Sequence, residues 1–447
     1  MSSQAGARLY VRDFGPIKEA RVELAPLTVF IGRNALGKSM LLYLLWVLET
    51  TPPDLEAIIQ HLGGYSALED KLKRLLKGRD LDAILSEFRA AIIHGFNVAF
   101  RERLTRAYGV KLGELIRVGA RACEIRLEEP GGVLCLSVHD DTLTVDLRLT
   151  EGAARDVKRH VEATLGLFKD AVKDIIGHIG FLLRLLTSFE VPVKEVPESY
   201  LLVDGRSGIV RVLRGSPGIL LRLKEILAGD ADFLEAVLAL ADAYRRGSVD
   251  TGAPAFRALL DELNFRPVVV EEFGLPRIYV ETWTGLKLPL EKAPSGIREL
   301  LPAMLAILDR SRPLIYIEEP EAHLHPRAIR LVPRLMAYAI NRLGKQVRIT
   351  THSDILVSQI NNLIAMSADP EGARELGYEP SELLRPEQVR AYWLRRAEDG
   401  DYVEVVELPV SETGFDEVEF AEVAEDLFVE RGEVYRLLEA KEKKSIA

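Results

Sequence analysis

Eight consecutive residues near the N-terminus have the types and the spacing that hold a polyphosphate. They match G-x-x-x-x-G-K-[ST] at every fixed position. An apolar run at 27–31 precedes them and another at 40–48 follows, as expected for a strand and a helix. The eight residues are Gly32, Arg33, Asn34, Ala35, Leu36, Gly37, Lys38 and Ser39.

These residue types suit phosphate chemistry for physical reasons. The two glycines let the backbone turn its N–H groups inward, and the start of the following helix adds the positive end of its dipole. We expect Lys38 to reach the β- and γ-phosphates of ATP and the Ser39 hydroxyl to ligate Mg²⁺. An ordinary glycine-containing turn between a strand and a helix is the alternative interpretation.

Two carboxylates directly follow another apolar run. Residues 313–317 lead into Glu318 and Glu319, a Walker B pattern. A parallel strand presents its carboxyl end at the ligand crevice, so we expect Glu318 to hold Mg²⁺, directly or through water. Glu319 is then the residue that orients and polarises the attacking water. The alternative is an acidic loop that caps a core strand, and the co-occurrence with the phosphate loop favours catalysis.

Two further segments have side chains suited to a nucleotide phosphate. Ser295 and Gly296 precede a run with helical periodicity, and such a helix start binds a γ-phosphate, even one held by another subunit. Capping of the helix by Ser295 is the simpler alternative. His352 follows the apolar run 347–351, and its place after the carboxylates favours a γ-phosphate contact over a satisfied buried histidine.

Other residues that could bind a metal favour structural roles. His323 and His325, with Glu321, could suggest a metal site. The two histidines are two residues apart in a loop-like segment with no further ligand evident, which favours a structural or interface role over zinc. Cys123 and Cys135 are the only two cysteines, each inside a strand-like run. They predict buried free thiols rather than a disulfide scaffold.

The spacing of apolar residues predicts an alternation of strands and helices. Three strand patterns separated by turns at 123–149 predict an antiparallel meander. Other strand patterns lie at 8–12, 20–24, 268–272, 278–284, 314–317 and 347–351. Helical patterns occupy most of 54–118, 153–187, 217–246, 295–308 and 328–343.

Taken together and in this order, these segments resemble the ABC-type ATPase heads of the OLD-like and RecF/SMC-like group. The similarity covers residues 9–50 and 290–365 and, more loosely, 389–408. Within it, 318–326 resembles the extended Walker B segment, 294–299 a degenerate signature and 351–353 the switch histidine. The signature lacks the full Leu-Ser-Gly-Gly run, and no Q-loop is assigned beyond the candidate Gln60. No acidic pattern of a Toprim-type nuclease is evident after His352, so we expect no such domain.

The resemblance implies an α/β fold: a P-loop NTPase head of the ABC type with an antiparallel β subdomain and a large helical insertion. We expect the head to comprise 1–50, 119–150 and 260–447, and the helical insertions to comprise 51–118 and 151–259. The resemblance also implies a homodimer formed on ATP binding. Each nucleotide would then lie between the phosphate loop, Glu318 and Glu319 of one subunit and Ser295 and Gly296 of the other.

The net charge of −10 at first argues against a polyanion partner, but it averages two regions of opposite sign. Thirteen acidic residues and no Lys or Arg lie within 398–430, which leaves a net charge of +3 for the remainder. A basic run at 71–79 could contact DNA phosphates, although a solvated helix face is the more common explanation. Its candidate contacts are Lys71, Lys73, Arg74 and Lys77.

Three functions are compatible with these features. The first is an ATPase that acts in DNA maintenance or anti-phage defence, and the second is an ATP-gated module that controls a separate effector, such as a nuclease. The third, the ATPase subunit of a transporter, is disfavoured by the degenerate signature and the helical insertion. Residues 1–10 lack the apolar core of a signal peptide and no run is long enough to span a bilayer, so we expect a cytoplasmic protein with no membrane partner.

Overall fold

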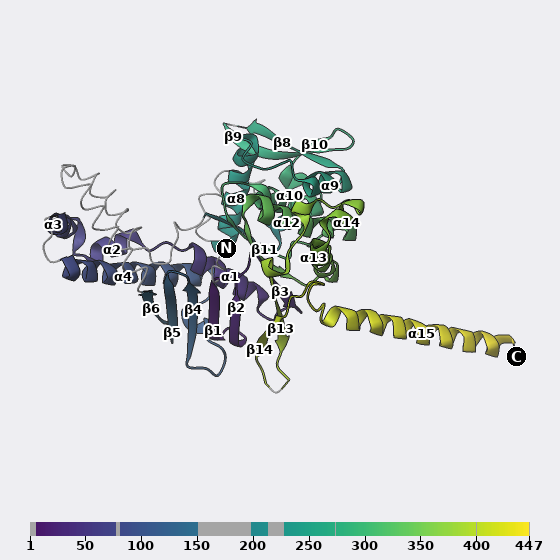
Figure 1. Ribbon diagram of the computed structural model, residues 1–447, viewed down its shortest axis with the longest axis horizontal. Coiled ribbons are helices and arrows are strands. Elements are labelled where there is room, and N and C mark those ends of the chain that lie inside the picture. The colour runs from purple at the N-terminus through teal and green to yellow at the C-terminus, as the bar shows by residue number, and fades with distance from the viewer. Residues whose placement is uncertain are drawn as a thin grey trace.

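A computed structural model describes residues 6–76, 81–150, 198–212, 228–272, 274–398 and 400–446. Its main feature is an eleven-stranded sheet with the order β6-β5-β4-β1-β2-β14-β13-β3-β12-β11-β7 (Figure 1). The strands of this sheet are β1 Arg8–Phe14, β2 Ile17–Glu23, β3 Leu27–Gly32, β4 Ala122–Glu129, β5 Gly132–His139, β6 Thr142–Leu149, β7 Ser199–Leu202, β11 Leu314–Glu318, β12 Gln346–Thr351, β13 Val389–Arg396 and β14 Val403–Leu408.

The half of the sheet that carries the candidate site is parallel. Strands β13, β3, β12, β11 and β7 run side by side in the same direction. Every residue of β3 is buried, as expected for a central strand covered on both faces. Parallel pairing aligns the carboxyl ends of these strands, so the segments that follow β3, β11, β12 and β7 meet at one edge.

The other half of the sheet is antiparallel. The meander predicted at 123–149 is confirmed as β4, β5 and β6, and β4 pairs with β1. Its strands alternate buried and exposed residues, so one face is packed and the other faces solvent. The tail strands β13 and β14 form a hairpin that lies between β2 and β3 and joins the two halves.

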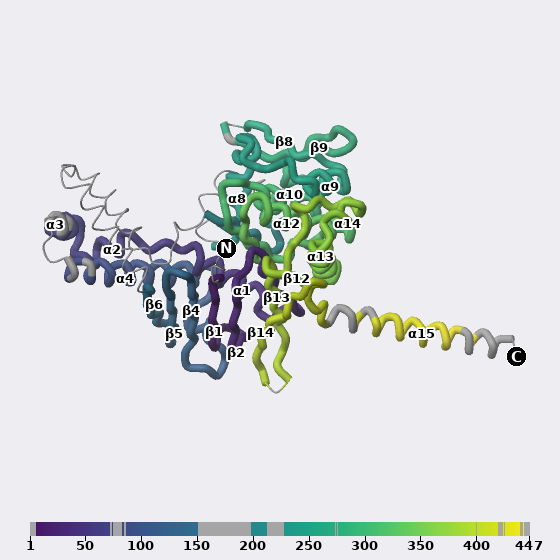
Figure 2. Tube along the Cα trace, viewed as in Figure 1, coloured from purple at the N-terminus to yellow at the C-terminus, as the bar shows by residue number. Residues whose placement is uncertain are grey.

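Helices cover the sheet and extend beyond it (Figure 2). Helix α1 follows β3 and packs against β3, β11 and β12, whereas α4 packs against β6. The helices are α1 Lys38–Thr50, α2 Leu55–His61, α3 Gly64–Leu76, α4 Leu81–Tyr108, α7 Arg206–Val212, α8 Ala228–Arg245, α9 Pro254–Glu262, α10 Ser295–Leu308, α11 Pro326–Ile329, α12 Leu331–Leu343, α13 Asp354–Ala365, α14 Pro370–Glu375 and α15 Glu419–Ile446. No helix among these described residues combines the length and apolarity needed to cross a membrane.

The region 151–259 differs locally from the expectation of a helical insertion. Within it, β7 pairs with β11 and forms the edge of the main sheet, because the run Tyr200–Val203 is apolar and buried on both faces. The helical pattern predicted at 153–187 lies outside the described residues, and that at 217–246 is described only from Ala228 as α8. A second sheet of β8 Phe265–Glu272, β9 Leu275–Thr282 and β10 Lys287–Pro289 confirms the two strands predicted there.

Candidate functional site

The segment predicted as a phosphate loop connects β3 to α1 through a backbone that only small residues allow. Gly32 has φ 147° and Gly37 has φ 88°, and Ala35 between them is also left-handed at φ 63°. A Cβ at Gly32 would collide with the carbonyl oxygen of Leu394 on the neighbouring strand β13. The loop therefore needs glycine at position 32 both for its backbone angle and for the close approach of β13.

Lys38 has a buried side chain in this segment. Its side chain is 6% exposed, and Nζ donates to the carbonyl oxygens of Gly32 at 2.8 Å and Arg33 at 2.9 Å. Burial lowers the pKa of Lys38, and the nearby carboxylates of Glu319, Glu321 and Glu318 oppose that shift. Ser39 is exposed beside it, as are Arg33, Asn34 and Ala35, while Leu36 and Gly37 are half-buried.

Glu318 ends β11 and is nearly inaccessible to solvent. Its Oε2 accepts hydrogen bonds from the Tyr43 hydroxyl at 2.6 Å and from the backbone N–H of Asp204 at 2.9 Å. Burial, followed by the charge of Glu318, raises the pKa of Asp230. The first carboxylate of the acidic pair is thus held by α1 on one side and by the segment after β7 on the other.

Glu319 begins the turn after β11 in a strained conformation. Its φ is 43°, and its N–H donates to the carbonyl oxygen of Thr350 on β12 at 3.0 Å. Its Oε1 lies 3.2 Å from Nδ1 of His352. The hydrogen bond between the two lowers the pKa of Glu319 and raises the pKa of His352.

Glu321 binds the segment that carries His352. It is 6% exposed, and its Oε1 accepts from the hydroxyl of Thr351 at 2.6 Å and from the backbone N–H of His352 at 3.0 Å. Burial raises the pKa of Glu321. Sequence reasoning considered Glu321 only as a possible metal ligand beside His323 and His325, whereas in the structure it fixes the backbone that presents His352.

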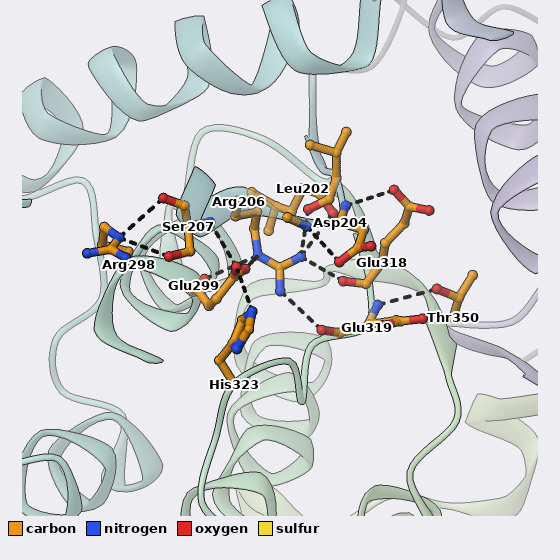
Figure 3. Close-up of polar contacts among 12 residues, drawn as sticks. Leu202, Asp204, Arg206, Ser207, Arg298, Glu299, Glu318, Glu319, His323 and Thr350 are labelled. Atoms are coloured by element: carbon orange, nitrogen blue, oxygen red, sulfur yellow. Dashed lines mark hydrogen bonds and ion pairs between the residues drawn. The ribbon is translucent and has the colours of Figure 1, made fainter. Parts of the chain in front are cut away.

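Arg206 connects this acidic turn to the helix that begins at Ser295 (Figure 3). Its guanidinium is fully buried and donates to the carbonyl oxygens of Glu318 at 2.6 Å and Glu319 at 3.1 Å. It also pairs with Glu299 on α10 at 3.1 Å. Sequence reasoning missed Arg206; the signal for it was the apolar run 200–203 followed by Asp204-Gly205, a strand and turn pattern.

Ser295 and Gly296 form the first turn of α10. Ser295 was expected to have capping as its simpler role, but the cap residue is Pro294 and Ser295 is the exposed first residue of the helix. A Cβ at Gly296 would lie 2.9 Å from the carbonyl oxygen of His323, so glycine permits that approach. Within the described part of the chain, no hydrogen bond or ion pair joins Ser295 to the phosphate loop.

The remaining candidate residues make contacts that fit structural roles. His325 caps α11 by accepting from the N–H of Arg327 at 3.4 Å, and His323 lies 3.9 Å from Glu299. No group of three or more His, Cys, Asp or Glu residues in the described ranges has the geometry of a metal site. Gln60 is exposed on α2, where it donates to Glu56 at 3.1 Å. Cys123 is buried and Cys135 half-buried, and both are free thiols.

The donors and acceptors at this edge fit a magnesium nucleotide. The glycine loop and the start of α1 offer backbone N–H groups, and Lys38 offers a cation, which together suit phosphate oxygens. Ser39 and Glu318 offer the hard oxygen ligands that Mg²⁺ prefers.

Comparison with known proteins supports the assignment of the fold. Residues 214–358 match the family described as an AAA domain, putative AbiEii toxin, Type IV TA system. The chain has the α/β fold of a P-loop NTPase: a glycine loop joins the central parallel strand β3 to α1, and the acidic turn follows β11. The segment matched contains the acidic turn, the start of α10 and His352, whereas the phosphate loop lies outside it. No curated protein matches the chain.

Solved structures similar to this chain include Smc heads. An Smc head with a coiled coil and joint from Pyrococcus yayanosii is 11% identical, covers 94% of this chain and 99% of its own, and has a TM-score of 0.43. An Smc head from Pyrococcus furiosus, bound to the C-terminal domain of ScpA, is 12% identical over 95% and 98% at a TM-score of 0.40.

Proposed function

We propose that this ATPase head binds ATP with Mg²⁺ and hydrolyses it by in-line attack of water on the γ-phosphate. The observation that carries the proposal is the convergence of Lys38, His352 and Glu319 at the carboxyl edge of three adjacent parallel strands. Lys38 would contact the β- and γ-phosphates, and Glu319 would orient the water. Mg²⁺ held by Ser39 and Glu318 would neutralise charge on the phosphate oxygens.

We further propose that two heads enclose the nucleotide. The N–H groups of the first turn of a 14-residue helix, α10, suit a phosphate, and Ser295 at that turn is exposed. Ser295 and Gly296 would therefore contact the γ-phosphate held by the phosphate loop of a second copy. His352, with its side chain 46% exposed, would contact the same phosphate from within the subunit.

The variant Glu319→Gln tests this proposal. We expect it to retain ATP binding, to lower the hydrolysis rate by about 100-fold or more, and to accumulate an ATP-bound dimer. The matched control is Glu371→Gln, which changes an exposed carboxylate paired with Arg374 on α14. Hydrolysis by Glu319→Gln at the parental rate would show that Glu319 is not the residue that activates water.

A second candidate function is an ATP-gated module with slow hydrolysis that controls a separate effector. The hydrogen bond from His352 lowers the pKa of Glu319, which makes its carboxylate a weaker base. A turnover below about one per minute, with the ATP-bound dimer as the main species and an effector that co-purifies only with ATP, would support this function. Turnover of many molecules per second by a chain that stays alone would support the first.

We propose a setting in anti-phage defence or DNA maintenance. The description of the matched family, which names a putative toxin of a Type IV TA system, supports defence. The basic run offers less free charge to DNA than its sequence indicates, because Lys71 Nζ donates to the Leu62 carbonyl at 2.8 Å and lies 3.1 Å from Glu87. Lys77 and the side chain of Lys73 lie outside the described residues.

Charge reversal tests the DNA contact. Changing Lys71, Lys73, Arg74 and Lys77 to Glu should abolish any stimulation of the ATPase by DNA and leave the basal rate unchanged. Unchanged stimulation would show that this basic run does not contact DNA.

A further inference from the structure

The C-terminal helix α15 is a 28-residue helix that extends away from the head (Figures 1 and 2). Its root is fixed, because Asn361 on α13 donates to the Phe415 carbonyl at 2.8 Å and accepts from the Phe415 N–H at 3.0 Å. At about 1.5 Å per residue, a helix of this length reaches about 42 Å. Its described side chains, those of residues 423, 425–438 and 441, are all exposed to solvent.

One face of α15 is apolar along most of its length. Val423, Leu427, Val434 and Leu438 recur at intervals of four, seven and four residues, which places them on one stripe. Their side chains are 48–61% exposed. Further large apolar side chains flank the stripe and are exposed as well: Phe428, Tyr435 and Leu437.

An exposed stripe of this extent normally marks an interaction surface, because contiguous apolar surface on a soluble protein is otherwise avoided. We propose that α15 pairs with α15 of a second copy of this chain as an antiparallel two-helix contact. This contact needs no nucleotide, so it is distinct from the ATP-enclosed dimer proposed above.

The charges along α15 select the orientation. Residues 419–432 carry five acidic residues and one basic residue, a net charge of −4, whereas 433–446 carry three acidic and four basic residues, a net charge of +1. A parallel pair would place −4 beside −4 and Arg431 beside the partner's Arg431 in the apolar stripe. An antiparallel pair places each acidic half beside a weakly basic half, which lowers the repulsion.

The same charges disfavour a lipid surface as the occupant of this face. Helices that lie on membranes carry Lys and Arg on their polar face and are attracted to anionic lipids. The first half of α15 is instead strongly acidic. A second copy is the occupant whose charge pattern complements that of the helix itself.

The oligomeric state of the full chain without nucleotide tests the proposal. By light scattering after size exclusion, we expect a dimer for the parent and a monomer for Leu427→Glu with Leu438→Glu. The matched control is Val429→Glu: Val429 is 54% exposed but lies about 200° around the helix from Leu427, so this variant should remain a dimer. The head should unfold at the same temperature in all three proteins, because the changed side chains are exposed in the single chain and lie outside the core.

Cross-linking tests the orientation. Full overlap of two antiparallel helices places Leu427 beside Leu438 of the partner subunit. Oxidation should therefore cross-link the double variant Leu427→Cys with Leu438→Cys, but not Leu427→Cys alone, whose two thiols would lie about 16 Å apart. The parent controls for Cys123 and Cys135.

The inference would be overturned by a monomeric parent at about 50 µM, or by a dimer that survives the glutamate variants. Cross-linking of Leu427→Cys alone would indicate a parallel pair and would overturn it too. Co-sedimentation of the parent, but not of the glutamate variants, with phosphatidylserine vesicles would also overturn it in favour of a lipid partner. Every measurement is made without ATP, so a negative result for the α15 contact would not count against the proposed hydrolysis. A negative result for hydrolysis would likewise not count against the α15 contact.

Discussion

Arg206 Nη1 lies 2.6 Å from the carbonyl oxygen of Glu318, so a residue outside every recognised motif is bonded directly to the acidic turn. The same guanidinium pairs with Glu299, four residues after Ser295 on α10. Arg206 is therefore a positioning residue in the proposed mechanism. It holds the backbone of Glu318 and Glu319 against the helix whose first turn would contact the partner's nucleotide.

Arg206→Met, alone and combined with Glu299→Met, tests whether Arg206 positions the acidic turn for catalysis or only stabilises the fold. Loss of the guanidinium leaves Glu299 buried without its partner, so we expect the free energy of unfolding to fall by about 3–5 kcal/mol. In the double variant with Glu299→Met, we expect most of that stability to return while kcat stays at least tenfold below the parent. Urea unfolding and steady-state ATPase assays measure the two quantities. Recovery of kcat together with stability would show that Arg206 is only structural.

His352 should titrate above its ordinary pKa of 6.5 because it hydrogen-bonds to Glu319. Its contribution to stability is fully present below pH 6.5 and is lost as the pH rises through the folded-state pKa. Glu319, with its lowered pKa, contributes above its ordinary value of 4.5 and loses that contribution as the pH falls through its folded-state pKa. The pair therefore contributes most to the free energy of unfolding between about pH 4.5 and pH 6.5.

An NMR titration of the histidine ring protons measures this effect. The His352 signal, assigned by its loss in His352→Gln, should shift to a lower pKa in Glu319→Gln. Since His352 is almost half exposed, the pair should contribute only about 0.5 kcal/mol to stability. An unchanged His352 pKa in Glu319→Gln would contradict the contact.

Gly32→Ala should destabilise the head and abolish nucleotide binding. The added Cβ would collide with the backbone of Leu394 at a backbone angle that side chains rarely adopt, at a cost of about 3 kcal/mol. Gly432→Ala is the control, because Gly432 lies within α15 with open space around its Cα and should gain up to about 1 kcal/mol. Unfolding by urea and binding of a fluorescent ATP analogue report the two effects. A Gly32→Ala protein that binds normally would show that the loop can relax.

Tyr43→Phe should weaken the binding of Mg²⁺ at the site. The Tyr43 hydroxyl is one of two donors to the Glu318 carboxylate, and its loss leaves that carboxylate less well oriented. We expect the Mg²⁺ concentration for half-maximal ATPase activity to rise about tenfold. Tyr65→Phe, at a tyrosine that is 65% exposed, should leave it unchanged. Equal Mg²⁺ dependence in both variants would indicate that Glu318 does not hold the metal.

Short-range patterns made much of this molecule predictable. The phosphate loop is eight contiguous residues, the meander has a period of two, and the acidic turn directly follows its strand, so each is visible in one window of sequence. The contacts of Tyr43 and Asp204 with Glu318 span 275 and 114 residues. They depend on which strand lies beside β11, and that neighbour, β7, is four residues long and lies within a region expected to be helical.

The eleven strands form one continuous sheet, and the strand that ends in the phosphate loop lies well inside it. At the β6 end of the sheet, α4 packs against β6, and α4 also packs against α1. There the Arg103 guanidinium of α4 lies 4.2 Å from the centre of the Trp46 ring of α1. Helix α1 packs against β3 and α4, and α4 packs against α2 and α3. A tilt of β3 would therefore be passed through α1 and α4 to α2 and α3.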